Sequence, residues 1–265
     1  MLRHAMPAGS WFTGSVRLLL SAQRCEKGDL SGNLAEHRRV LEEAQRSGCE
    51  LALFPEMSLT GSVDPATHPE RLTSLDDPGV ATLAALTLDV GVAAVFGIAE
   101  RDRDGHPYIT QVFANGGRVT GVQRKRHLGE GEEAYSTADD DAVFEVGGTR
   151  FAIAICAESK TNRPFAYAES AGARFVCFAA APGLYERRTT EAEWRGGWEW
   201  WLSAGLADVQ RHARERQLLI AIATQAGSTV DEDFPGLAAL VGPNGAVVAQ
   251  LPDRHPGTLV VDVPD

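Results

Sequence analysis

Residues 150–160, which read RFAIAICAESK, constrain the fold of this chain more than any other stretch. Residues 151–155 form an apolar, partly β-branched run that is long enough for a buried strand and too short for a helix. The run ends at Cys156, and the positions after it are small or polar. In α/β proteins, ligands bind at the carboxyl ends of strands. The stretch therefore predicts an α/β protein with a thiol at the functional edge of a sheet.

Cys156 has two possible roles at that position. A thiol at a strand end, with the backbone N–H of Ala157 directly behind it, can combine a nucleophile with an oxyanion donor. The ordinary alternative is a buried cysteine that simply completes a core strand. A base and a cation elsewhere in the chain would favour the nucleophile.

Composition and charge exclude several classes of protein. The chain has 265 residues and a formal net charge of −11. Such a charge repels the phosphate backbone, so we expect no nucleic-acid partner. No apolar run approaches the about 20 residues that span a bilayer, so we expect no membrane partner. The cysteines are widely spaced and form no CxxC pair, which is typical of a cytoplasmic protein without a disulfide framework or zinc site: Cys25, Cys49, Cys156 and Cys177.

Strand-like and helix-like segments alternate along the chain in two halves. In the first half, apolar periodicity predicts helices over 33–47 and 80–89 and strands over 16–22, 51–54, 92–98, 109–114 and 118–126. In the second half it predicts helices over 163–170 and 196–216 and strands over 151–155, 174–179, 218–223, 238–241 and 246–251. The helices of each half can cover only one sheet face. Two halves packed sheet against sheet predict a four-layer α-β-β-α sandwich.

Turn signals and domain boundaries complete this outline. The dipeptides Asp104-Gly105, Asn115-Gly116 and Asn244-Gly245 predict hairpins. No linker-like or low-complexity segment divides the two halves, so residues 15–265 are expected to form a single domain. Residues 1–14 lack the apolar core of a signal peptide and are expected to form a flexible N-terminal arm.

Glu56 is a candidate base for the Cys156 thiol. It follows the predicted strand over 51–54 and a proline, so its carboxylate is expected to project from a strand end, as Cys156 does. Burial in an apolar rim disfavours the charged carboxylate and raises its pKa, which suits a general base. The alternative is a loop carboxylate with a capping or solvation role.

Lys125 is a candidate cation within a basic run that would ordinarily be an exposed anion patch. If the strand continues, Gln123, Lys125 and His127 face one side, while Arg124 and Arg126 stay solvated on the other. A buried ammonium lowers the pKa of a neighbouring thiol and stabilises an oxyanion. His127 is expected to be packed and hydrogen-bonded rather than catalytic.

In this order, FPEMSLTG, RKRHL followed by EEAY, and IAICAES resemble the motifs of the nitrilase superfamily, the carbon–nitrogen hydrolases. The likeness extends from LLLSAQ near the start to GPNGAVVAQL near the end. It implies the α-β-β-α sandwich. Residue by residue, it implies Cys156 as the nucleophile, Glu56 as the general base and Lys125 as the oxyanion-stabilising cation.

The resemblance also implies an accessory glutamate in the segment GEGEEAYS. The family's additional glutamate usually precedes an aromatic residue by three positions, which implies Glu132, before Tyr135, with Glu133 as the alternative. This carboxylate would orient the lysine and the substrate.

Aromatic and basic residues after residue 184 are candidates for the pocket mouth. Tyr185, Trp194 or an arginine of the pair Arg187-Arg188 would line it, and an arginine would favour a substrate carboxylate. Trp198 and Trp201 are instead assigned to helix packing, because they fall on the apolar stripe of the helix predicted over 196–216.

The leading hypothesis is an amidase that releases ammonia from a small linear amide through a thioester acyl-enzyme. A nitrilase or an N-carbamoyl amino acid hydrolase would use the same three residues, and a catalytically silent binding or regulatory protein would keep the fold. We expect no metal and no organic cofactor, because the chain has no HExxH, Walker or GxGxxG motif. The expected partners are a small amide or nitrile substrate and further copies of the chain, in a homodimer or larger oligomer.

Overall fold

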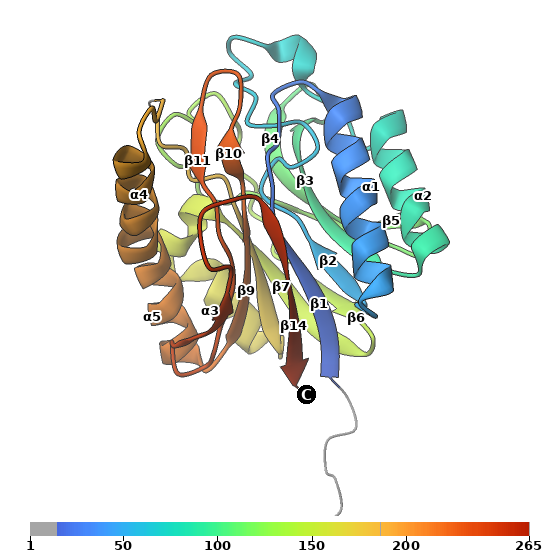
Figure 1. Cartoon of the computed structure of the whole chain (residues 1–265). Helices are drawn as coiled ribbons and strands as arrows, with labels where there is room; N and C mark the ends of the chain where they lie inside the picture. The colour runs from blue at the N-terminus through green and yellow to red at the C-terminus, as the bar shows by residue number, and fades with distance from the viewer. Residues whose placement is uncertain (1–14, 186, 265) are drawn as a thin grey trace, which may run out of the picture.

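The computed structural model of the protein describes residues 15–185 and 187–264. The predicted flexible arm over residues 1–14 lies outside the described residues. Two six-stranded sheets face each other, and helices cover the outer face of each (Figure 1). The predicted four-layer α-β-β-α sandwich is confirmed.

The first sheet has the strand order β14 (Gly257–Pro264), β1 (Ser15–Ala22), β2 (Leu51–Leu53), β3 (Ala93–Arg101), β4 (Pro107–Asn115) and β5 (Arg118–Arg124). β1, β2 and β3 run parallel, and the outer strands pair antiparallel. Helices α1 (Leu30–Arg46) and α2 (Pro78–Val90) link the parallel strands. α1 begins where the Asp29 side chain accepts a hydrogen bond from Gly32 N at 2.9 Å, and α2 ends at the left-handed Gly91.

The second sheet repeats this plan, with the order β13 (Val247–Gln250), β12 (Ala238–Val241), β9 (Leu219–Thr224), β8 (Phe175–Ala180), β7 (Thr149–Ile155) and β6 (Val143–Val146). β7, β8 and β9 are its parallel strands. Its outer face is covered by α3 (Arg163–Ser170), α4 (Glu191–Trp200) and α5 (Leu206–Arg216). The short elements are β10 (Ala226–Ser228), β11 (Asp233–Pro235), and the single turns η1 (Pro69–Arg71), η2 (Cys156–Lys160) and η3 (Trp201–Gly205).

Several elements differ from the sequence prediction, and β6, β10 and β11 were not predicted. The helix predicted over 196–216 starts earlier, at the capping box of Thr190 with Glu193, and is interrupted by the π turn η3. β14 was not predicted. It returns to the first sheet and pairs antiparallel with all of β1, where Arg17 Nε contacts Asp262 Oδ1 at 2.8 Å.

Strand alternation divides the apolar residues into three layers. Val95 and Ile153 point between the two sheets, whereas their neighbours Phe96 and Ala154 point toward the helices. Within residues 15–185 and 187–264, no helix is long and apolar enough to cross a bilayer.

The two sheets meet at one edge. Gln23 directly follows β1 and Gln225 directly follows β9, and the two residues form an isolated parallel bridge. Ala226 N donates to Gln23 O at 2.9 Å. The carboxyl ends of the parallel strands of both sheets therefore come together at this edge, where ligands bind in α/β folds.

Candidate active site

Each of the three candidate residues lies directly beyond a strand or close to its end. Lys125 follows β5, Cys156 follows β7, and Glu56 lies shortly after β2. β2 and β5 belong to the first sheet and β7 belongs to the second. The site is therefore assembled from both sheets.

Glu56 is held by the second sheet and is 1% exposed. Its Oε2 accepts a hydrogen bond from Ala181 N at 2.9 Å, and its backbone carbonyl accepts one from Gln225 Nε2 at 2.9 Å. Burial raises the pKa of the Glu56 carboxyl above its usual value, the charge of Lys125 opposes this, and the Glu132 carboxylate adds to it. A carboxylate with a raised pKa is a better proton acceptor near neutral pH.

Lys125 is fully buried between two carboxylates. Its Nζ donates to Glu56 Oε1 at 2.7 Å and to both carboxylate oxygens of Glu132, at 2.6 and 2.7 Å. Gly129 N donates to Glu132 Oε2 at 2.6 Å and fixes that carboxylate. Burial disfavours the charged amine, but Glu56, Cys156 and Glu132 outweigh it and raise the Lys125 pKa. A permanent positive charge thus lies inside the protein, paired on two sides.

Cys156 is half-buried at the start of η2 and has a φ of +44°. Non-glycine residues rarely adopt this left-handed conformation, and such strain is common at functional sites. Burial raises the pKa of the Cys156 thiol, the Glu56 carboxylate raises it further, and Lys125 lowers it. We expected the ammonium to lower the thiol pKa; it acts in that direction, but burial outweighs it. The raised pKa favours the protonated thiol, so attack by the sulfur would require a base.

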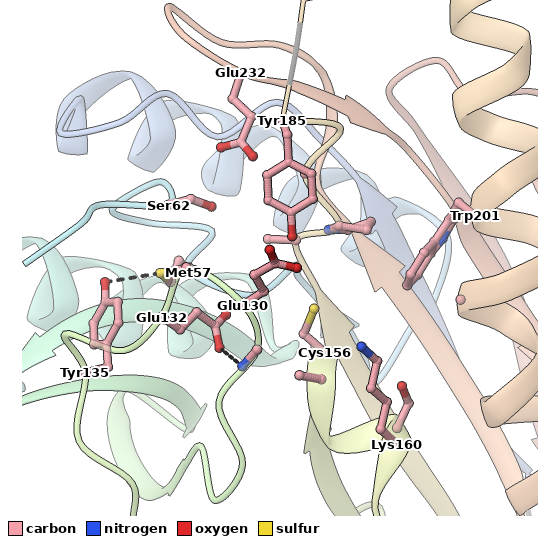
Figure 2. A pocket seen from close by; sticks show the side chains of 18 of the residues that line it. Met57, Ser62, Glu130, Glu132, Tyr135, Cys156, Lys160, Tyr185, Trp201 and Glu232 are labelled. Atoms are coloured by element: carbon pink, nitrogen blue, oxygen red, sulfur yellow. Dashed lines mark hydrogen bonds between the residues drawn. The ribbon is translucent and has the colours of Figure 1, made fainter.

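A cavity of about 660 Å³ opens onto the thiol. Cys156, Ala157 and Glu132 line it, and side chains from distant segments complete it: Glu130, Lys160, Tyr185, Trp200, Trp201 and Glu232. Figure 2 shows the Tyr185 ring pointing into the cavity above Cys156, with Lys160 on the other side of the sulfur. Cys25, Cys49 and Cys177 are buried elsewhere. A small molecule in this cavity would therefore reach Cys156 and none of these three thiols.

Two residues that we predicted as site residues lie outside this cavity. Glu133 is exposed and accepts a hydrogen bond from Gly131 N at 3.1 Å. Trp194 packs under Arg254, whose guanidinium carbon lies 4.5 Å from the ring centroid. The early start of α4 explains the position of Trp194. It puts Trp194 in the first turn and brings Trp200, at the end of the helix, to the cavity.

The arginine pair predicted at the pocket mouth contacts Asp233 instead. Arg187 Nη1 lies 3.4 Å from Asp233 Oδ1, and Arg188 N donates to Asp233 Oδ2. Asp233 is 1% exposed, and its buried charge accounts for the placement of both residues. Neither arginine lines the cavity that holds Cys156.

The basic run around Lys125 also differs from the prediction. β5 ends at Arg124, so strand alternation does not extend to Arg126. The Arg126 side chain is 3% exposed and pairs with Glu158 at 2.7 Å and with Asp141 at 2.5 Å, whereas His127 is exposed. Our predictions of a solvated Arg126 and a packed His127 are wrong. Glu158, two positions after Cys156, is the residue of the sequence that could have indicated a buried cationic partner such as Arg126.

Comparisons with known proteins agree with this architecture. Residues 19–265 match the family model for carbon-nitrogen hydrolases. A Pseudomonas protegens protein described as a hydrolase in the pqqF 5′ region is 24% identical, over 92% of this chain and 82% of its own length. An aliphatic nitrilase from Rhodococcus rhodochrous is 25% identical, over 84% of this chain and 68% of its own length.

A solved structure shows the same fold. An amidase from Nesterenkonia sp. AN1 superposes with a TM-score of 0.81 at 24% identity, and the match covers 94% of this chain and 93% of that one.

Proposed function

The chain belongs to the carbon–nitrogen hydrolase family, and from this premise we propose that it is a cysteine-dependent amidase acting on a small linear amide. The observation that carries the proposal is the contact of Lys125 Nζ with Glu56 at 2.7 Å and with Glu132 at 2.6 Å, beside the Cys156 cavity. A base, a cation and a thiol at one buried edge are the groups that acyl transfer requires.

In the first half-reaction, Glu56 takes the proton from Cys156 Sγ as the sulfur attacks the amide carbonyl carbon. Lys125 and the backbone N–H of Ala157 stabilise the negative charge that develops on the carbonyl oxygen. Glu56 then gives its proton to the leaving nitrogen. The C–N bond breaks, ammonia departs, and the acyl group stays on Cys156 as a thioester.

In the second half-reaction, Glu56 takes a proton from a water molecule, which attacks the thioester carbonyl. The carboxylic acid departs and the proton returns to the sulfur. Glu132 holds the Lys125 ammonium in place through both steps, because its two oxygens accept from Nζ at 2.6 and 2.7 Å. The raised pKa of the Glu56 carboxyl supports its assignment as the proton carrier.

A solved structure of similar fold supports a nucleophilic cysteine. In a variant of the amidase from Nesterenkonia sp. AN1, the acetamide moiety of fluoroacetamide is covalently added at the active-site cysteine. We infer that Cys156 is the corresponding nucleophile here.

The direct test measures ammonia release from a panel of small amides, nitriles and N-carbamoyl compounds. We expect release from amides by the natural chain and none by Cys156→Ala. A brief reaction of the natural chain with the best amide, stopped with acid, should leave the acyl group on Cys156, and its mass identifies the substrate. Absence of ammonia from every compound would refute the proposal.

A nitrilase is the second candidate, favoured by the likeness to the aliphatic nitrilase of Rhodococcus rhodochrous. An N-carbamoyl amino acid hydrolase would use the same residues. Faster ammonia release from a nitrile or a carbamoyl compound than from any amide would identify either one.

A silent binding protein with this fold would have no need of a reactive thiol. A thiol-directed electrophile should label Cys156 before the buried Cys25, Cys49 and Cys177 in either case, because Cys156 lines the cavity. The proposed enzyme predicts in addition that an amide is turned over with release of ammonia, which a silent protein does not do.

The proposal extends to a homodimer or larger oligomer in the cytoplasm. The exposed rings of Tyr185 (70%) and Trp200 (47%), both at the cavity, support an interface beside the site. Light scattering during gel filtration measures the mass; a monomer at micromolar concentration would contradict this part of the proposal.

A further inference from the structure

One buried carboxylate touches the backbone on both sides of the candidate site. Glu158 is 0% exposed, and its Oε2 accepts from Ile155 N at 2.9 Å, directly before Cys156. Its Oε1 accepts from Arg126 N at 2.6 Å, directly after Lys125. A single side chain therefore links the peptide groups next to the thiol and next to the ammonium.

The Arg126 guanidinium completes this link. Its Nε donates to Glu158 Oε1 at 2.9 Å and its Nη2 to Glu158 Oε2 at 2.7 Å. Nη2 also donates to Ile153 O at 2.8 Å, inside β7. The two-pronged pair with a carboxylate fixes orientation as well as distance. Arg126 lies beyond the end of the first sheet and Glu158 in η2 beyond the second, so the pair spans the site.

Buried ion pairs of this kind are seldom retained for stability alone, since their desolvation offsets the attraction. Here the pair adjoins a strained residue, because Cys156 has a φ of +44°. Strained backbone persists only where its surroundings over-determine it. The bonds of Glu158 to Ile155 N and Arg126 N supply such a constraint.

We propose that Glu158 and Arg126 are positioning residues that set the distance and orientation between Cys156 Sγ and Lys125 Nζ. This inference rests on the proposed function, because it takes these two atoms as nucleophile and oxyanion cation. Glu158 itself does not line the cavity, so it acts through the backbone and not on the substrate.

Asp141 provides a matched control. It also pairs with Arg126, at 2.5 Å, and Asp141→Asn removes a carboxylate charge just as Glu158→Gln does. Its other partner is Arg163, at 3.1 Å, and it bonds neither Ile155 N nor Arg126 N. Loss of an ion pair is therefore common to both variants, and loss of the backbone link is specific to Glu158→Gln.

The experiment measures kcat and KM for the best amide, and the rate of Cys156 alkylation by iodoacetamide, in both variants after circular dichroism confirms folding. We expect Glu158→Gln to lower kcat about 10²-fold, as small misplacements of reacting groups do, and to change KM less than about threefold. Cys156 alkylation should slow and change its pH profile. For Asp141→Asn, kcat, KM and the rate of Cys156 alkylation should stay near the values of the natural chain.

Equal losses in the two variants, or an unchanged kcat in folded Glu158→Gln, would overturn the inference. If Glu158→Gln does not fold, Arg126→Lys replaces it, because lysine keeps the charge but loses the two-pronged bond. The same kcat loss with unchanged KM is expected, and natural activity in that variant refutes the positioning role.

Alkylation separates this inference from the proposed function. If the natural chain releases no ammonia from any compound, the amidase proposal fails. The difference in Cys156 alkylation between Glu158→Gln and Asp141→Asn then still decides whether the pair positions the thiol.

Discussion

Lys125 Nζ lies 2.7 Å from Glu56 Oε1, although 69 positions separate the two residues in the chain. Both side chains are essentially inaccessible, at 0% and 1% exposure. A charged pair of this kind inside a protein is held by geometry and by further hydrogen bonds, here from Lys125 Nζ to Glu132 and from Ala181 N to Glu56. The relationship places an ammonium and a carboxylate at fixed positions near Cys156, and the predictions below test what each contributes.

Replacement of Lys125 by methionine should abolish most turnover without unfolding the chain. Methionine has similar volume but no charge, so an oxyanion would lose a donor, which costs about 3 kcal/mol in the transition state. We expect kcat to fall about 10²-fold, with a folded circular dichroism spectrum. Lys125→Ala should show the same loss. Near-normal ammonia release by either folded variant would contradict the role of the ammonium.

The Cys156 thiol should react as a protonated group at neutral pH. Burial and the Glu56 carboxylate raise the pKa of this thiol well above its ordinary value. The alkylation rate by iodoacetamide should therefore keep rising as the pH increases past 9, because the thiolate is the nucleophile. Mass spectrometry of Cys156 at each pH measures this rate. A plateau below pH 9 would indicate a thiolate already formed by pairing with Lys125.

The activity should be lost on acidification at a pH that lies above the usual pKa range of a carboxyl group. In the proposed mechanism Glu56 must be ionised to accept the thiol proton, and burial raises its pKa above 4.5. As the pH falls through this raised pKa, the base is lost, so the acid limb of kcat/KM should lie above pH 4.5. Glu56→Gln should remove both the limb and the activity, and an acid limb at or below pH 4.5 would contradict the assignment.

The charge of the cavity should select among substrates. Three carboxylates act on the Tyr185 phenol and help to raise its pKa, after burial as the largest cause: Glu130, Glu232 and Glu132. Cationic amides should therefore be preferred over anionic ones of equal size. Glu130→Gln should lower kcat/KM for a cationic amide by up to about fivefold, as expected for an exposed pair, and leave a neutral amide unchanged. Lys160→Gln is the control. If the natural chain prefers anionic amides and Lys160→Gln abolishes that preference, the predicted preference for cationic amides is wrong.

Gly97 should tolerate no side chain, because it packs against the segment that carries Glu56. A Cβ there would overlap Met57 N and approach Glu56 C at 2.9 Å. Gly97→Ala should therefore displace Glu56 and reduce both kcat and the free energy of unfolding in urea, by about 1–3 kcal/mol for overpacking. Gly196→Ala, in α4, is the control, since its Cβ would meet nothing within 4 Å. Equal stability of the two variants would contradict the close approach.

Local sequence determined most of the individual elements. Apolar periodicity located the buried strands β2, β7 and β8, because their side chains are enclosed on both faces. The three turn dipeptides were also correct, since Gly105, Gly116 and Gly245 have positive φ at the hairpins β3–β4, β4–β5 and β12–β13. β14 was missed because Val261 and Val263 are its only buried residues, which leaves an alternation too short to indicate a strand.

The sequence by itself determined that a carboxylate, an amine and a thiol follow strands, because strand length and termination are local properties of the chain. Only the tertiary structure decided that Glu132, and not the adjacent Glu133, contacts Lys125, and that Arg126 is buried against Glu158. Neighbouring residues of the same type have the same local preferences. Which of them is buried depends on charged partners that the packed fold places: Glu158 of the opposite sheet for Arg126, and the buried Lys125 for Glu132.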